Sequence, residues 1–306
     1  MAKNIKLVRR LNQRYKNFSF SELMTKADEE YLESIIEMDK TGNVLSESKF
    51  DKQGELEEKN SLSYTGDGKL TEHVLYYAMD DVTEKRVLNR NEQGRLLEEL
   101  KVYGDDSGEK TAYEYNEKGL ISAIIEYDEE GAFVSREDIK YDSEGSVFER
   151  IKIDENGNLI DRVLFEKTND NKVVLEKEFG SDGELKNVTT ISFDEKGKEL
   201  SSYQSTPEGK LITGVETTYD DRGNVIERLY KDFYAKSVRY EYDENNRMIT
   251  QELYDGSGLL LRKNIYEYDE SGNLLTEQTF EMDNSRGNKE KHFGTRYEYE
   301  FYEENL

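Results

Sequence analysis

Several residue types that carry chemistry are absent or scarce. The 306-residue chain has no cysteine, which excludes disulfides, thiolate metal sites and cysteine nucleophiles. It has two histidines, His73 and His292, and neither has a neighbour at a spacing typical of metal ligands, so we expect both to be solvated. Phosphate-binding glycine loops and the HExxH and GxSxG motifs are missing. We therefore expect no metal, no cofactor and no enzymatic activity.

Long apolar runs are also missing. No segment approaches the roughly 18 apolar residues of a membrane-spanning helix. The first residues, MAKNIKLVRRLNQRYKNF, are basic and lack the apolar core of a secretory signal. We expect a chain without a transmembrane segment that stays in the cytoplasm or leaves it by a specialised route other than the Sec pathway.

Positive charge is in short supply outside the N-terminus. The chain carries 43 Lys and Arg against 68 Asp and Glu, for a net charge of -25. Such a charge disfavours direct nucleic-acid binding by the acidic body and favours a protein partner with a basic surface. The first 21 residues differ, because they hold six basic residues and no acid. These candidate partner-binding residues are Lys3, Lys6, Arg9, Arg10, Arg14 and Lys16.

Proline is nearly absent, but aromatic residues are not. A single proline, Pro207, accompanies 22 tyrosines and 12 phenylalanines. Disordered segments are rich in proline and poor in aromatic residues, so this composition predicts a folded chain.

One short pattern recurs along the chain: an aromatic or aliphatic residue, Asp, two polar residues, Gly, any residue, then an aliphatic. Clear copies are Tyr141–Val147, Ile153–Leu159 and Tyr268–Leu274. Asp opens a type I turn, and Gly takes the left-handed position after it and forms a bulge that rejoins two antiparallel strands. The pattern therefore predicts hairpins in which Tyr141 pairs with Val147 and Tyr268 pairs with Leu274.

The spacing of the glycines gives a period. From residue 119 onward the intervals alternate between 12 and 14, so two turns make one period of 26. This period requires turn positions at 171 and 246, where Asn replaces Gly and tolerates the same backbone. It also includes Gly108 as a turn glycine. The structural turn residues predicted with most support are Gly131, Gly145, Gly157, Asn171, Gly223, Asn246, Gly258 and Gly272.

The seven or nine residues left between turns suit one strand each. We expect an all-β repeat fold: a long, coiled antiparallel meander or β-solenoid of roughly twenty strands, because so many twisted strands do not stay flat. Seven and nine are both odd, so the residues that begin and end each strand are expected on one apolar face.

The N-terminal segment has a different pattern. Ile5, Val8, Leu11 and Tyr15 recur at helical spacing, and Ser19-x-x-Glu22 matches a capping box. We expect residues 1–29 to form a basic, partly helical cap on a repeat domain at 30–306. A cap would cover the first strand edge. The alternatives are a basic handle for a partner, nucleic acid or membrane surface, and a disordered segment.

The hairpin pattern resembles the YD-repeat, or RHS-repeat, family over roughly residues 38–275. The matching residues are Tyr127 to Gly131, Tyr141-Asp142, Tyr219-Asp220, Tyr254-Asp255 and Tyr268-Asp269. The resemblance implies a bacterial origin, a spiralling antiparallel sheet and a non-enzymatic shell, scaffold or binding role. Family members often have Asp-Pro turns and shells that enclose a toxin, whereas this chain has only Pro207 and is too short for a shell. A looser similarity to MORN-type repeats points the same way.

Uniform turn chemistry without a catalytic cluster favours a non-catalytic scaffold, adaptor or component of a bacterial secretion or surface assembly. One alternative is a carbohydrate-binding module that uses exposed tyrosines. A second is an acidic decoy for a nucleic-acid-binding protein. The oligomeric state stays open.

Overall fold

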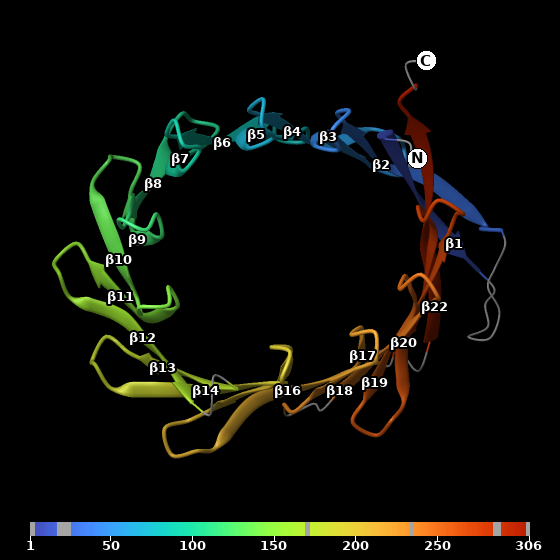
Figure 1. The fold of residues 1–306 in the computed structure, drawn as a ribbon. Coiled ribbons are helices and arrows are strands. Elements are labelled where there is room, and N and C mark those ends of the chain that lie inside the picture. Colours follow the sequence, from blue (N-terminus) through green and yellow to red (C-terminus); the bar gives the residue numbers. More distant parts are fainter. Residues whose placement is uncertain (1–3, 17–25, 169–171, 233–235, 284–288, 304–306) are drawn as a thin grey trace. The chain divides into compact units, whose positions relative to one another are not determined.

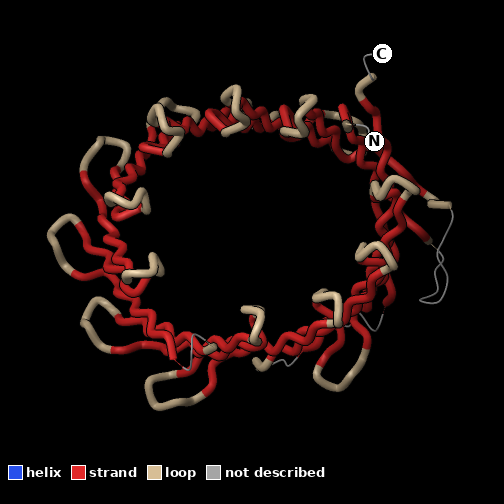
Figure 2. The backbone as a smooth tube through the Cα atoms, viewed as in Figure 1, coloured by secondary structure: helices blue, strands red, loops and turns tan. Residues whose placement is uncertain are grey.

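The computed structural model describes residues 4–16, 26–168, 172–232, 236–283 and 289–303. The described residues contain strands and turns and no helix (Figures 1 and 2). The strands are β1 (Ile5–Tyr15), β2 (Glu29–Met38), β3 (Val44–Phe50), β4 (Leu56–Tyr64), β5 (Leu70–Tyr77), β6 (Val82–Arg90), β7 (Leu96–Val102), β8 (Gly108–Tyr115), β9 (Ile121–Tyr127), β10 (Phe133–Tyr141), β11 (Val147–Asp154), β12 (Leu159–Thr168), β13 (Val173–Phe179), β14 (Leu185–Phe193), β15 (Glu199–Ser205), β16 (Leu211–Tyr219), β17 (Val225–Tyr230), β18 (Lys236–Tyr242), β19 (Met248–Asp255), β20 (Leu260–Tyr268), β21 (Leu274–Asp283) and β22 (Lys289–Phe301).

The chain divides into two compact units. Unit 1 comprises residues 1–84, 219–227 and 236–306, and unit 2 comprises residues 85–218 and 228–235. In unit 1, antiparallel pairing runs without a break from β18 to β22, then to β1, and on to β5. In unit 2 it runs from β6 to β16.

The two ends of the chain meet in unit 1. Strand β1 pairs antiparallel with β2 on one side and with β22 on the other (Figure 1). The sheet is therefore closed where its first and last strands join, and neither strand is left with a free edge. The prediction of an open meander or β-solenoid is wrong, because its ends pair with each other and its hydrogen-bonding edges are satisfied that way.

The predicted helical cap is also wrong, since residues 5–15 form β1. The register of β1 shifts at Ile5/Leu7 against β22 and at Arg10/Leu11 against β2. The shift against β22 leaves Lys6 of β1 without a partner, so Ile5 and Val8 share a face at an interval of three, as they would on a helix. The shift against β2 adds its extra residue, Glu33, to β2. The predicted capping box at Ser19 and Glu22 lies outside the described residues.

The hairpin turns follow the predicted chemistry. At residues 142–146, the Asp142 N–H donates to the Ser146 carbonyl at 2.8 Å, and the Gly145 N–H donates to the Asp142 carbonyl at 3.2 Å. The Asp142 carboxylate also accepts the Ser146 N–H at 2.8 Å, which fixes the turn. The predicted pairs Tyr141 with Val147 and Tyr268 with Leu274 are confirmed.

The turn slot takes positive φ. The values are 77° at Gly131, 87° at Gly145, 79° at Gly157, 93° at Gly223, 60° at Asn246, 86° at Gly258 and 90° at Gly272, while Asn171 lies outside the described residues. Gly108 differs from the expectation, because Asp106 takes the left-handed position of that turn with a φ of 66°. Gly108 instead begins β8, where an added Cβ would lie 2.5 Å from the Lys101 carbonyl oxygen.

A second irregularity follows most of the described turns and was not expected, although the β7–β8 hairpin lacks it. Lys140 pairs with Glu149 and Tyr141 pairs with Val147, so Phe148 is an extra residue without a cross-strand partner. The same one-residue shift recurs through both units. We call the extra residues bulge residues: Leu45, Glu57, Thr71, Leu97, Ser122, Val134, Phe148, Ile160, Lys186, Leu200, Ile212, Ile249, Leu261 and Leu275.

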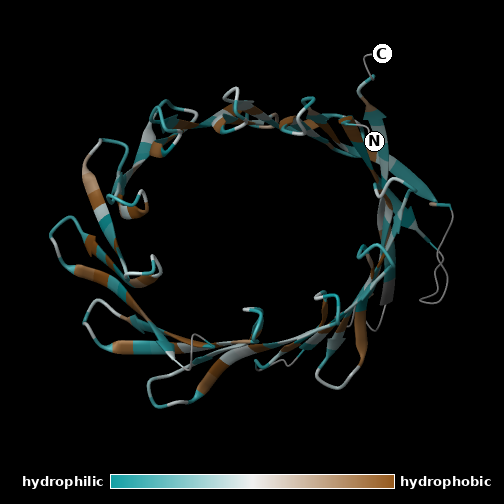
Figure 3. Cartoon of the chain, viewed as in Figure 1, coloured by the Kyte–Doolittle hydropathy of each residue, from teal (hydrophilic) through white to brown (hydrophobic). Residues whose placement is uncertain are grey.

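These bulges overturn the expectation of a single apolar face. Cross-strand partners share a face, so Val147 lies with Tyr141 and Glu149 lies with Lys140, on opposite sides of the sheet. Apolar and polar residues are accordingly mixed along the strands in each unit (Figure 3). Among the described residues, the buried apolar side chains are Val8, Tyr15, Ala123, Ile125 and Phe280.

Candidate functional site

Four of the six predicted partner-binding residues, Lys6, Arg9, Arg10 and Arg14, lie on β1, and two of these form ion pairs. Arg9 contacts Glu300 of β22 at 2.6 Å, and Arg10 contacts Glu47 of β3 at 3.5 Å. Carboxylates of the adjacent strand β22 and of β3, one strand further on, therefore neutralise part of the basic charge of β1.

The remaining members of the set differ in their surroundings. Lys16 pairs with Glu29 at 3.6 Å. Lys6 and Arg14 are exposed and form no ion pair within the described part of the chain, while Lys3 lies outside it. The structure thus places four of the predicted residues on β1 and Lys16 just after it, and does not gather these five into one cluster.

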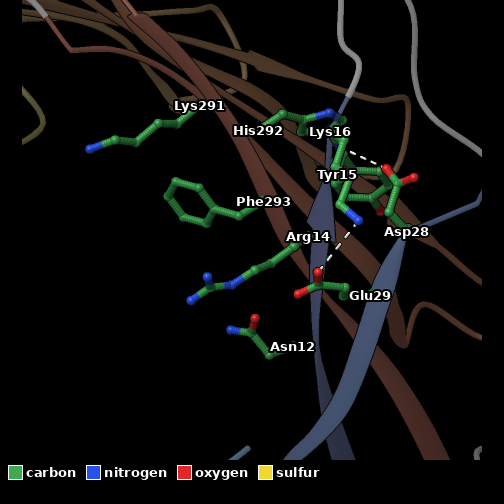
Figure 4. A pocket seen from close by; sticks show the side chains of 9 residues that line it. All are labelled: Asn12, Arg14, Tyr15, Lys16, Asp28, Glu29, Lys291, His292 and Phe293. Atoms are coloured by element: carbon green, nitrogen blue, oxygen red, sulfur yellow. Dashed lines mark hydrogen bonds and ion pairs between the residues drawn. The ribbon is translucent and has the colours of Figure 1, made fainter. Parts of the chain in front are cut away.

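A pocket of about 700 Å³ opens in unit 1 where β1, β2 and β22 meet (Figure 4). It is lined by Asn12, Arg14, Tyr15, Lys16, Asp28, Glu29, Lys291, His292 and Phe293. The register sets Arg14 directly opposite Phe293, with Lys291 two residues away on the same strand. Lys16 interacts with both acidic residues of the pocket. Its main-chain N–H donates to the Asp28 carboxylate at 2.7 Å, and its ammonium lies 3.6 Å from the Glu29 carboxylate.

His292, at the back of this pocket, is buried with only 4% of its surface exposed. Its ring stacks between Tyr15 and Phe280, with ring centroids 3.9 and 4.1 Å away. Its Nε2 lies 3.1 Å from Gln278 Oε1. Burial lowers the pKa of His292 to about 4. The expectation of a solvated histidine is therefore wrong for His292, because the pairing of β22 with β1 encloses the ring.

A chain of hydrogen bonds continues from this stack across three strands. The Tyr15 hydroxyl donates to Gln13 at 2.8 Å, and the Gln13 amide donates to Glu30 at 2.8 Å. Arg296 donates to both carboxylate oxygens of Glu30, at 2.8 and 3.0 Å, and holds the pKa of Glu30 below its usual value. These bonds tie β1, β2 and β22 together at the junction of the chain ends.

The bulge residues form a second candidate surface. Eight of them are large apolar side chains with 38–45% of their surface exposed: Leu45, Leu97, Val134, Phe148, Ile160, Leu200, Ile212 and Leu275. Consecutive hairpins lie at opposite ends of the strands, so these residues alternate between two rims of turns. In unit 2, Leu97, Phe148 and Leu200 lie at one rim, and Val134, Ile160 and Ile212 lie at the other.

The sequence signal for this surface was an aliphatic residue three positions after the turn glycine. Its exposure depends on the bulge, which the turn motif alone did not reveal. Other bulge positions are polar, namely Glu57, Thr71, Ser122 and Lys186. The apolar character is thus a property of particular hairpins and is not required by the turn itself.

The tyrosines that end alternate strands have a structural use. Their hydroxyls donate to main-chain carbonyls about twenty residues earlier in the chain, as from Tyr64 to Val44 at 2.7 Å and from Tyr268 to Met248 at 2.8 Å. The same contact joins Tyr115 to Leu96 and Tyr141 to Ile121 in unit 2. These hydroxyls are engaged within the sheet.

Two familiar features are absent from the part of the chain that the structure describes. No three His, Cys, Asp or Glu side chains gather there in a way that would hold a metal ion. No helix in the described ranges is long and apolar enough to cross a membrane.

No protein-family model matches the sequence, and no curated protein is similar to it. Among solved structures, a porin-like protein from Bacteroides uniformis ATCC 8492 is 8% identical, with 98% of each chain covered and a TM-score of 0.32. A structure described as TcdB2-TccC3 without hypervariable C-terminal region is 12% identical over 89% of this chain and 19% of that chain, with a TM-score of 0.23. The present chain thus spans about a fifth of that second protein, and neither likeness supports an inference about function. The resemblance to YD repeats stays a prediction.

Proposed function

We propose that this protein is a non-catalytic interaction scaffold that binds a protein partner through its apolar bulge residues. The observation that supports the proposal is the exposure of eight large apolar side chains at one equivalent position of the repeat. Bulges re-aim side chains, and each hairpin with an apolar bulge residue presents that residue beside its turn.

The energetics favour contact with another protein. Apolar surface removed from water contributes about 25 cal/mol per Å², so several such side chains buried together supply a useful part of a binding free energy. The net charge of -25 favours a partner with a basic surface, because complementary charge speeds encounter and selects the partner. Carbohydrate binding has less support, since tyrosine hydroxyls suited to a sugar are bonded within the sheet.

Site-specific photo-crosslinking in the native host tests the proposal. A photoreactive residue replaces Phe148, Ile160, Leu200 or Ile212 in separate variants of the full chain. The matched controls carry it at Ser122 or Lys186, which are bulge residues without apolar character. We expect a discrete protein adduct from apolar positions and little from the polar ones. Equal adduct yields at both kinds of position, or no adduct at any position, would overturn the proposal.

A further inference from the structure

The two rims of unit 2 differ in charge. We call the turns at residues 103–107, 128–132, 154–158 and 180–184 the acidic rim, because they contain nine carboxylates and no Lys or Arg. The carboxylates are Asp105, Asp106, Asp128, Glu129, Glu130, Asp154, Glu155, Asp182 and Glu184. The opposite rim, with turns at residues 91–95, 116–120, 142–146 and 194–198, has six carboxylates interleaved with Arg95, Lys118, Lys196 and Lys198.

Ion pairing sharpens this difference. None of the nine carboxylates of the acidic rim takes part in an ion pair with another described residue. On the opposite rim, Lys167 lies 3.7 Å from Asp142 and 3.8 Å from Glu144, and Lys172 lies 3.5 Å from Glu195. The negative charge of the acidic rim is therefore not neutralised by ion pairs with described residues.

Exposed apolar side chains lie beside the turns of the acidic rim and beside the next turn on the same side, residues 206–210, which carries Glu208 and Lys210. Phe133, Val134, Ile160, Leu211 and Ile212 are exposed by 36%, 40%, 38%, 47% and 45%. Turns on one rim lie two strands apart, about 9.6 Å, so the four acidic turns extend over about 29 Å. A helix of about 19 residues has this length.

We propose that the acidic rim of unit 2 binds a cationic, amphipathic segment of the partner protein. This proposal rests on the proposed function. It assigns the binding of the partner protein to one rim of unit 2 and to a cationic, amphipathic segment of that partner. Lys and Arg side chains of the segment face the turn carboxylates, and its apolar residues cover the exposed side chains at the strand ends. Charge complementarity selects this occupant, because a neutral apolar segment would leave nine carboxylates uncompensated.

A binding experiment with the full chain tests the assignment. The probes are a labelled 18-residue helical peptide of Leu and Lys, and a matched peptide with Ser in place of Leu. Fluorescence anisotropy compares E129Q/E130Q/E155Q/E184Q, at the acidic rim, with E92Q/E117Q/E144Q/E195Q, at the opposite rim. Both variants lose four acids, so their net charges are equal.

We expect the acidic-rim variant to bind the Leu/Lys peptide about tenfold more weakly and the opposite-rim variant to change less than about threefold. Ile160→Ser with Ile212→Ser should also weaken binding more than Leu97→Ser with Leu200→Ser. Circular dichroism confirms that each variant is folded.

Equal losses in the two quadruple variants, equal binding of the Ser/Lys peptide, or no binding at low salt would overturn the assignment. The crosslinking experiment separates this failure from that of the proposed function. Adducts from Phe148 and Leu200 alone would keep the function and overturn the rim assignment. The absence of adducts at all four apolar positions would overturn the function whatever the peptide result.

Discussion

The ring of His292 shows how one residue can report on the joining of the chain ends. It lies on β22 and is enclosed by Tyr15 of β1 and Phe280 of β21, in an environment that disfavours the charged imidazolium. In the unfolded chain its pKa is near 6.5, whereas in the folded protein it is about 4. The folded state therefore binds fewer protons than the unfolded state between these values.

This difference predicts a loss of stability with acid. The stabilising contribution of neutral His292 is complete above pH 6.5 and is lost as the pH falls toward 4, amounting to about 2 kcal/mol between pH 7.5 and 5. Urea denaturation at both pH values should show this loss in the natural chain and a smaller one in His292→Phe. An unchanged pH dependence in His292→Phe would contradict the assignment.

Most of the described hairpins combine a predictable turn with a bulge in the following strand that the turn motif did not predict. The turn needs only Asp and a residue that accepts positive φ, as at Asp142 and Gly145. The bulge residue that follows, Phe148, changes which face the rest of the strand presents. Glu149 consequently shares a face with Lys140, where it contacts both Lys140 and Arg162 at 2.6 and 2.5 Å.

Removing the bulge should therefore cost more than removing its side chain. Phe148→Ser should change the free energy of unfolding by less than about 1 kcal/mol, because the side chain is exposed. Deletion of Phe148 should cost about 3 kcal/mol or more, because residues after it would turn to the other face and bury unpaired charges. Urea denaturation monitored by circular dichroism measures both. If the deletion lowered the free energy of unfolding no more than the substitution does, the bulge would not determine the face on which the following residues lie.

Closure depends on β1, a strand from one end of the chain that bridges β2 and β22. Its contacts extend over almost its entire length, from Ile5 opposite Phe301 to Tyr15 opposite His292. Without it, β2 and β22 would each present unpaired N–H and C=O groups, which invite pairing with another chain.

Deletion of residues 1–16 should convert the protein into species that associate through these edges. We expect sedimentation velocity to show concentration-dependent oligomers, and a synthetic peptide of residues 4–16 to restore the smaller species. A peptide with Val8→Asp and Tyr15→Asp is the control and should fail to restore it, because both side chains are buried. A truncated chain with the sedimentation behaviour of the full chain would contradict this role for β1.

Local chemistry alone determined the antiparallel hairpins of this protein, because Asp, Gly and the aromatic or aliphatic flanks act within seven residues, as from Tyr268 to Leu274. The separation of a basic N-terminal segment from an acidic remainder was also evident from the sequence alone. Only the tertiary structure decided the pairing of β1 with β22, the burial of His292 and the exposure of Phe148. The first two depend on contacts between residues nearly three hundred positions apart, and the local periodicity of the sequence carries no information about such contacts. The third depends on a bulge, which appears only in the register between two paired strands.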